Sequence, residues 1–351
     1  MTILYTVKLF PAPIKRLEFG ISFGALYADT LTCVRYSKEA ESRGYSYLFY
    51  PDSQMIYRDP FVVIAAVSQN TEKAILGTLA TSVATRDPTV LACAAQSAYE
   101  VSGGRFVLVL STGDSSVRRI GLEPVKPDKF ENAVKYVKNL LEGRKFNFGT
   151  GEFGMRFAGG GVPVYVVATG MKTLRVAGKV GDGAVVMVGP ALTSWAIEQV
   201  RKGCEEVGCA FEEKPMFWCG FCMLHEDRTV AKSRVKPSVS WYATNFPTLV
   251  KNTGVSLPAD FWDKVNNFRS SYERYDLVHS DSWDQAAEES SFIPDELVDK
   301  MALAGTPEDV VDRLRYLERL GVSRVVIRPP SHSDWYTVFR MFAEHVIPCF
   351  C

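Results

Sequence analysis

Small residues and hydroxyls follow an apolar run in the stretch ILGTLATSVATRDP, residues 75–88. The apolar start at 74–76 is typical of a buried strand, and Thr81 and Ser82 lie in the polar part that follows it. A packed core gains little from hydroxyls, so we interpret this stretch as a surface on which a flat ligand lies against the backbone. An Ala-rich helix is expected from Pro88 onward.

Two further strand ends place glycine and hydroxyls before a helix, STGDSS at 111–116 and TGMK at 169–172. Backbone amides at helix N-termini bind phosphate, and Lys172 adds a positive charge. Together with the hydroxyl-rich stretch, the two loops indicate a phosphate-bearing cofactor that lies across several strands. The alternative is that they are ordinary helix caps and tight turns.

Polar and ionisable side chains follow two other strands. Asp52, Ser53 and Tyr57 come after the second predicted strand, and His332 comes after the last. Asp52 could instead orient Ser53 or cap the next helix, and His332 could equally cap a helix. The four histidines are scattered without metal-ligand spacing, so we predict no metal site. No nucleophile-elbow motif for a catalytic serine is present either.

The eight cysteines are too few for a disulfide scaffold. Cys219 and Cys222 form a C-x-x-C pattern, but it lies inside the apolar run 216–224 and no second pair follows. We therefore predict buried thiols rather than a zinc or redox site.

Alternating strands and helices must position these residues. Eight apolar runs are expected to be strands: 17–23, 47–50, 74–80, 105–110, 163–168, 184–188, 216–224 and 324–328. Helical patterns lie between them at 31–43, 89–101, 128–141, 172–180, 193–207 and 307–320. Eight such units predict an α/β fold, a (β/α)8 TIM barrel, formed as a single domain over 1–351.

Two insertions interrupt the pattern. The segment KFNFGTGEFGMRF, 145–157, predicts a β-hairpin, and the aromatic-rich segment 235–300 predicts a helical insertion over the barrel mouth. Thr306 is expected to cap a helix, and Gly44 and Gly321 to end one. The aromatic residues of the insertion either pack it onto the barrel or form a lid over an apolar substrate.

Composition excludes some partners. Forty basic and forty acidic residues give a net charge of zero without a basic block, so nucleic acid is not an expected partner. No apolar run approaches the length of a membrane span, and the first ten residues lack the features of a signal peptide. We therefore expect a cytoplasmic protein that binds a small molecule and does not bind membranes.

Four segments resemble the bacterial-luciferase-like oxidoreductases, and most of all the branch with the deazaflavin-dependent methylenetetrahydromethanopterin reductases. They are LGTLATSVATRDP, SGGRFVLVLSTGDSSVRRIGLEP, VPVYVVATGMKTLRVAGKVGDGAVV and AGTPEDVVDRLRYLERLGVSRVVI. The resemblance covers about residues 17–235 and 295–350, in the order found in the family. It implies a (β/α)8 barrel, commonly a homodimer, that holds coenzyme F420 or FMN in its mouth.

The resemblance also implies a role for individual residues. A cis peptide bond between Leu79 and Ala80 would support one face of the ring, with Thr81 and Ser82 close by. The remaining implied cofactor contacts are Asp114 and Ser115 near the ring or ribityl chain, Thr169, Gly170 and Lys172 near the phosphate, and Gly183 packed behind them. Asp87 stands where the family often has histidine, and it can cap the following helix.

One departure from the family concerns proton transfer. Several members carry Asp-His after the second strand, where this chain has Asp52-Ser53. Serine is not a general acid near neutral pH without a partner base, so a proton donor must lie elsewhere. Asp52, Tyr57 and His332 are the candidates.

The function that the resemblance implies is hydride transfer between a flavin-type cofactor, with F420 favoured, and a small organic substrate. One alternative is a monooxygenase that uses reduced FMN and oxygen. A second is a flavin-binding protein without catalytic activity, which the serine at position 53 suggests.

Overall fold

The computed structural model describes residues 16–275 and 282–350, of which 271–275 are described by their backbone alone. All eight predicted strands are present, and they pair in parallel. They are β1 (Glu18–Ser22), β2 (Tyr47–Tyr50), β3 (Ile75–Thr78), β5 (Phe106–Ser111), β8 (Val164–Ala168), β9 (Gly183–Val186), β10 (Met216–Leu224) and β12 (Arg324–Arg328). Helices follow these strands along the chain, so the fold is the predicted (β/α)8 barrel.

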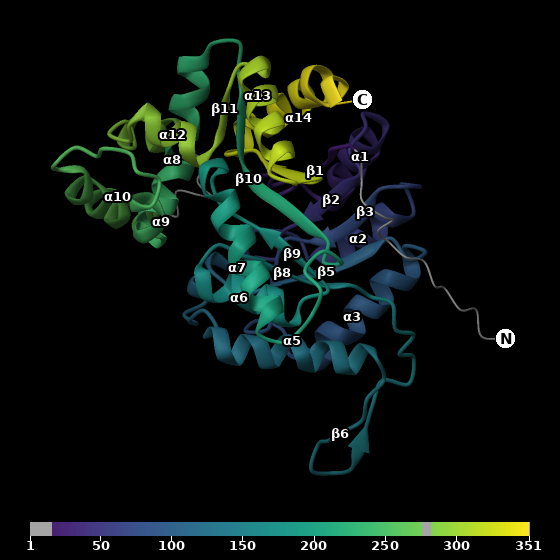
Figure 1. The fold of residues 1–351 in the computed structure, drawn as a ribbon. Helices are drawn as coiled ribbons and strands as arrows, with labels where there is room; N and C mark the ends of the chain where they lie inside the picture. The colour runs from purple at the N-terminus through teal and green to yellow at the C-terminus, as the bar shows by residue number, and fades with distance from the viewer. Residues whose placement is uncertain (1–15, 276–281, 351) are drawn as a thin grey trace. The chain divides into compact units, whose positions relative to one another are not determined.

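Two compact units make up the described chain. The first comprises Ala28–Val186 and Glu198–Met216, and the second Arg16–Tyr27, Met187–Ile197 and Phe217 onward. In the first unit β2, β3, β5, β8 and β9 pair in that order (Figure 1). In the second, β10 pairs with β12, which pairs with β1.

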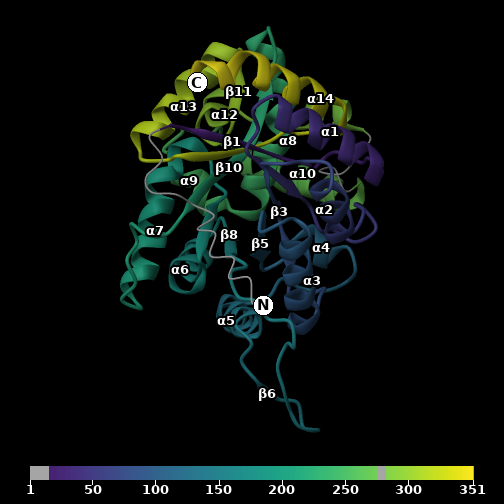
Figure 2. The same cartoon turned by 90° about the vertical axis from the view of Figure 1, so that its right-hand side faces the viewer.

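The helices of the first unit are α1 (Thr30–Ser42), α2 (Pro60–Ser68), α3 (Pro88–Val101), α4 (Ser115–Arg118), α5 (Pro127–Leu141) and α6 (Met171–Val180). Of these, α1, α3, α5 and α6 begin within one residue of their predicted starts, whereas α2 and α4 lie outside the predicted helical ranges. Asp87 caps α3 by accepting a hydrogen bond from the amide of Thr89, as predicted. The hairpin predicted at 145–157 is formed by β6 (Phe146–Asn147) and β7 (Glu152–Phe153), and it extends away from α5 (Figures 1 and 2).

The second unit contains most of the remaining helices. They are α8 (Arg228–Asn245), α9 (Pro247–Lys251), α10 (Phe261–Tyr275), α11 (Trp283–Glu289), α12 (Asp295–Met301), α13 (Pro307–Arg319) and α14 (His332–Met341), while α7 (Thr193–Glu205) is shared between the units. Thr306 and Asp309 form a capping box at the start of α13. Gly44 and Gly321 have positive φ values at the ends of α1 and α13, as predicted.

The predicted insertion 235–300 is helical, and residue 235 falls inside α8 rather than at a boundary. Its aromatic side chains pack on one another: the Phe292 ring lies 5.8 Å from that of Phe261 and 6.2 Å from that of Phe268. The side chains of Tyr272 and Tyr275 lie outside the described part. Among the described helices, none is long and apolar enough to cross a membrane.

Two strand predictions need correction. The strand expected at 74–80 stops at Thr78, and the chain pairs with β5 again only at β4 (Thr81–Ser82). A further strand, β11 (Leu303–Gly305), pairs with the end of β10 and was not predicted. Three residues are too few to give a periodic pattern.

Candidate active site

The break between β3 and β4 is bridged by a side chain. The Thr78 hydroxyl donates to the Val109 carbonyl at 2.9 Å and accepts from the Val109 amide at 3.0 Å. These are the main-chain groups that a continuous β3 would have bonded. The Thr78 side chain thus supplies the hydrogen bonds that the Val109 main chain of β5 would otherwise lack, at the point where the backbone after Thr78 leaves the sheet.

The segment that leaves the sheet is Leu79–Ala80, and its peptide bond is cis, as the resemblance implied. Both residues are half-buried, whereas Gly77, Thr78, Thr81 and Ser82 on either side are buried. The accessible part of this strand end is therefore a short stretch with a small side chain at position 80.

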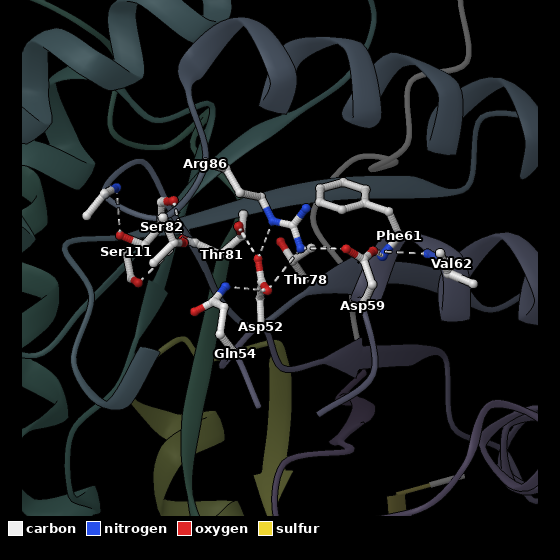
Figure 3. Close-up of polar contacts among 12 residues, drawn as sticks. Asp52, Gln54, Asp59, Phe61, Val62, Thr78, Thr81, Ser82, Arg86 and Ser111 are labelled. Carbon is white, nitrogen blue, oxygen red and sulfur yellow. Dashed lines mark hydrogen bonds and ion pairs between the residues drawn. The ribbon is translucent and has the colours of Figure 1, made fainter. Parts of the chain in front are cut away.

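Asp52, after β2, holds β4 in place (Figure 3). Its carboxylate is only 4% exposed and accepts from the Thr81 hydroxyl at 2.6 Å. It also accepts two hydrogen bonds from Arg86, at 2.8 and 3.1 Å, and one from the Gln54 amide at 3.2 Å. The carboxylate is thus the hub that fixes the hydroxyl-rich stretch to the end of β2.

Arg86 is shared between two carboxylates. It donates to Asp59 at 2.7 Å as well as to Asp52, and its guanidinium carbon lies 5.2 Å from the centre of the Phe61 ring (Figure 3). The hydrogen bond with Asp52 is the main reason that the pKa of Arg86 is raised above its usual value. Arg86 was not among the predicted site residues. The available signal was an acid and an arginine after adjacent strands, whose ends meet at one edge of the sheet.

Ser53 and Ser115 are brought together. Their hydroxyl oxygens are 3.2 Å apart, which joins the residue expected near the substrate to one expected near the cofactor. Tyr57 is half-buried, and its amide donates to the Ser53 carbonyl at 3.1 Å. Asp114 lies just before α4 and is 3.5 Å from Arg118.

The N-terminus of α6 lacks a side-chain cap among the described residues. Gly170 occupies the N-cap position with extended backbone. Thr169 beside it is buried, and Lys172 in the first turn is exposed. Free amides with a nearby lysine are what a phosphate group requires.

Gly183 has a role in packing. A Cβ atom at this position would lie 2.4 Å from the ring of Tyr165, its partner in the register of β8 and β9. The requirement for glycine at position 183 therefore follows from the neighbouring buried tyrosine.

His332 belongs to the second unit, where it is the exposed first residue of α14. Its Nδ1 accepts a hydrogen bond from the amide of Tyr27 at 3.2 Å. A neutral imidazole with Nδ1 accepting carries its proton on Nε2, so the ring presents a donor.

Cys219 and Cys222 are buried free thiols within β10, as predicted. Burial raises the pKa of Cys219 to about 11 and raises that of Cys222 further above the usual value. Both thiols are therefore protonated and unreactive at neutral pH. In the described part of the chain, no three His, Cys, Asp or Glu residues gather as a metal site requires.

Comparisons with known proteins identify the family of the chain. The family model described as luciferase-like monooxygenase matches residues 27–324. A 5,10-methylenetetrahydromethanopterin reductase from Archaeoglobus fulgidus is 27% identical over 324 residues, which cover 89% of this chain and 94% of the relative.

Solved structures share the fold. The coenzyme F420-dependent tetrahydromethanopterin reductase of Methanopyrus kandleri superposes with a TM-score of 0.79 at 22% identity, covering 96% of this chain and all of that one. A type II Baeyer–Villiger monooxygenase of Pseudomonas putida in complex with FMN gives 0.65 at 14% identity, covering 96% and 99% of the two chains. The protein is an oxidoreductase, and it belongs to the luciferase-like monooxygenase family.

Proposed function

We propose that this protein transfers a hydride between coenzyme F420 and a small organic substrate. The observation that carries the proposal is the half-buried Leu79–Ala80 segment, which is accessible between residues that are buried on both sides. Similarity over 89% of the chain to a methylenetetrahydromethanopterin reductase, together with the fold shared with a coenzyme F420-dependent tetrahydromethanopterin reductase, favours F420 over FMN.

The residues of the first unit fit such a cofactor. The Leu79–Ala80 backbone supports the flat ring, and Thr81 and Ser82 fix that backbone from behind through bonds to Asp52 and the Ala84 amide. The uncapped amides at the start of α6, with Lys172, bind a phosphate. The bound deazaflavin supplies the hydride carrier, and the protein supplies position and electrostatics.

The acid–base residues then take different roles. Asp52 accepts four hydrogen bonds, including two from Arg86, so it acts as a positioning residue. Ser53 and Ser115 together offer hydroxyls to the substrate or ring. His332 is our choice as proton donor, through Nε2, because its Nδ1 is held by the Tyr27 amide. Tyr57 is the alternative donor.

A second candidate function is oxygen activation by reduced FMN. The observation that favours it is the fold shared with an FMN-bound monooxygenase, at a TM-score of 0.65. Binding without turnover is a third candidate. A homodimer, a cytoplasmic location and a lid formed by 235–300 remain predictions.

Titration of the purified protein with F420, FMN and riboflavin tests the proposal. Riboflavin is FMN without the phosphate, so this pair isolates the contribution of the phosphate. We expect submicromolar binding of F420, weaker binding of FMN, and at least tenfold weaker binding of riboflavin than of FMN. Lys172→Gln should reduce the FMN-to-riboflavin preference, while Lys202→Gln, in α7, should leave it unchanged.

Turnover then separates the candidates. Oxidation or reduction of bound F420 by a panel of small alcohols, aldehydes and imines supports the hydride-transfer function, and His332→Gln should lower its rate at saturating substrate. Oxygen consumption with reduced FMN would favour the monooxygenase. Failure of both cofactors to bind would overturn the proposal.

A further inference from the structure

The guanidinium of Arg328 lacks the partners that other half-buried arginines have. Arg328 ends β12, and its Nη1 donates to the sulfur of Met187 at 3.0 Å, its one hydrogen bond among the described residues. Its guanidinium carbon lies 4.5 Å from the centre of the Phe221 ring. Within residues 16–275 and 282–350 no carboxylate pairs with it. By contrast, Arg86 pairs with Asp52 and Asp59, and Arg234 with Asp284 and Asp334.

Strand register shows which way Arg328 points. In β1, Phe19 packs against Phe342 of the helical layer, with ring centroids 5.3 Å apart, so its face of the strand meets the helices. Phe19 is in register with Val325 of β12. Side chains alternate along a strand, so Arg328, three residues after Val325, is on the opposite face, away from that layer. Phe221 is in register with Arg328 and shares its face.

A second unpartnered polar group packs against the same phenylalanine as this arginine. Tyr242 of α8 is completely buried, and its ring centroid is 5.9 Å from that of Phe221. Its hydroxyl has no hydrogen-bond partner among the described residues. Burial raises the pKa of Tyr242 above its usual value, and the nearby positive charge of Arg328 opposes that shift. The phenol is therefore a protonated donor that packs, like the guanidinium, against Phe221.

Both groups are donors, and both are costly to bury without an acceptor. A guanidinium offers five N–H groups in a planar fork that matches carboxylate and phosphate oxygens. The site also lies at the carboxyl end of a barrel strand, where (β/α)8 enzymes bind their substrates. An anionic oxygen group would satisfy Arg328 and Tyr242 together, while Phe221 orients the guanidinium.

We propose that Arg328 and Tyr242 bind an anionic group, a carboxylate or a phosphate, carried by the substrate. This inference rests on the proposed function for the identification of the ligand as substrate. It predicts that the small organic substrate is an acid or a phosphate ester rather than a neutral alcohol or aldehyde.

Anion binding by the intact protein provides the test. Thermal unfolding is followed with increasing sodium phosphate or sodium succinate at constant ionic strength set by chloride, with and without saturating F420. We expect either anion to raise the Tm of the wild-type protein. In Arg328→Gln the concentration needed for half the effect should rise at least tenfold. The anion with the larger effect identifies the chemical class of the substrate.

Arg201→Gln is the matched control. Arg201 also stacks on a phenylalanine, 4.2 Å from the centre of the Phe211 ring, but it pairs with Glu198 and Glu212. This variant also removes one arginine charge, but from a guanidinium that already has carboxylate partners. Its anion response should therefore remain that of the wild type. Tyr242→Phe should weaken the response at least threefold, a change that a merely structural role would not produce.

Three results would overturn the inference. The wild-type protein could fail to respond to either anion, or Arg328→Gln could respond as the wild type does. Alternatively, F420 could abolish the response, which would assign the anion site to the cofactor. If neither F420 nor FMN binds but the response depends on Arg328, the anion site stands and the proposed function fails.

Discussion

The polar groups at the end of β3 are bonded to one another, whereas those at the end of β12 are not. In the first region Thr78 bonds to Val109, and Thr81 and Arg86 bond to Asp52. In the second, among the described residues, the Arg328 guanidinium contacts a thioether and an aromatic ring and pairs with no carboxylate, and the Tyr242 hydroxyl has no hydrogen-bond partner.

This difference separates residues that hold the site in place from residues that are available to bind a ligand. A buried donor that is hydrogen-bonded within the protein stabilises the fold, and it has no free N–H or O–H group for a substrate. A buried donor without one costs stability, and a ligand that supplies the acceptor recovers that cost as binding. The end of β3 is therefore a scaffold whose accessible part is backbone, and the end of β12 is a recognition surface.

Removing the hub of the scaffold should have the largest effect. Asp52→Ala leaves Arg86, only 19% exposed, without its principal partner, so we expect the free energy of unfolding to fall by about 4 kcal/mol. Urea unfolding followed by circular dichroism measures the change. Asp59→Ala removes the 41%-exposed partner and the cap of α2, and should cost only about 1 kcal/mol. Equal losses in the two variants would contradict the role of Asp52 as the hub.

The bridge across the strand break should come next. Thr78→Val keeps the shape of the side chain but leaves the amide and carbonyl of Val109 without their partner. We expect a loss of about 3 kcal/mol, since each buried group left unbonded costs about 1–3 kcal/mol. Thr78→Ser keeps the hydroxyl and should lose about 1 kcal/mol, the contribution of one methyl group. Urea unfolding of both variants tests this, and a serine variant as unstable as the valine variant would disprove the bridge.

A third variant tests whether Gly183 serves packing or the cofactor. Gly183→Ala places a methyl group against the Tyr165 ring, and overpacking of this kind costs about 2 kcal/mol. The double variant Gly183→Ala/Tyr165→Leu should be less destabilised than the sum of its single variants, because the clash is absent. Additive losses in thermal unfolding would mean that the methyl group meets something other than Tyr165.

Local patterns explain why the fold was predictable. Each main strand is a short apolar run. Helix starts are marked by capping residues such as Asp87 and Thr306, whose side chains bond to amides only two or three residues further along the chain. The misplaced end of β3 has a different origin. Leu79 and Ala80 are apolar like a strand, and nothing local indicates that Thr78 replaces the backbone in the pairing with β5.

The site was less predictable because its partners are distant in sequence. The run of hydroxyls indicated a ligand, yet the Thr78 and Thr81 hydroxyls bond to residues 31 and 29 positions away. No pattern in the sequence distinguishes a hydroxyl with a protein partner from one without. Arg328 is a single charge at the end of an apolar run, and only the contacts of its guanidinium single it out.

The loop that leads into β3 is held by a carboxylate, so its contribution to stability should depend on pH. The Glu41 carboxylate of α1 accepts from the amides of Glu72, Lys73 and Ala74, at 2.9, 2.7 and 2.6 Å. Burial acts to raise the pKa of Glu41, but these amides outweigh it and leave the pKa below its usual value. A lowered pKa in the folded state means that the charged carboxylate stabilises the fold above about pH 4.3, its unfolded value. This stabilisation is lost as the pH falls through the folded pKa.

Thermal unfolding between pH 7 and pH 3 tests this contribution. The Tm of Glu41→Gln should lie below that of the wild type at pH 7, and the difference should shrink as the solution becomes acidic. Glu72→Gln, which changes an exposed carboxylate nearby, should follow the wild type throughout. A Glu41→Gln deficit that stays constant down to pH 3 would show that the carboxylate charge does not hold the loop.

The smallest expected effect is the sharpest test of the comparison. Tyr50 and Tyr242 are both buried, but the Tyr50 hydroxyl lies 2.7 Å from that of Ser37. Tyr50→Phe should therefore lower the free energy of unfolding by about 1 kcal/mol. Tyr242→Phe removes a hydroxyl without a described partner, so without added anion its stability should equal or slightly exceed that of the wild type. If both variants lose the same stability, the Tyr242 hydroxyl is already bonded in the folded protein, and the end of β12 is scaffold like the end of β3.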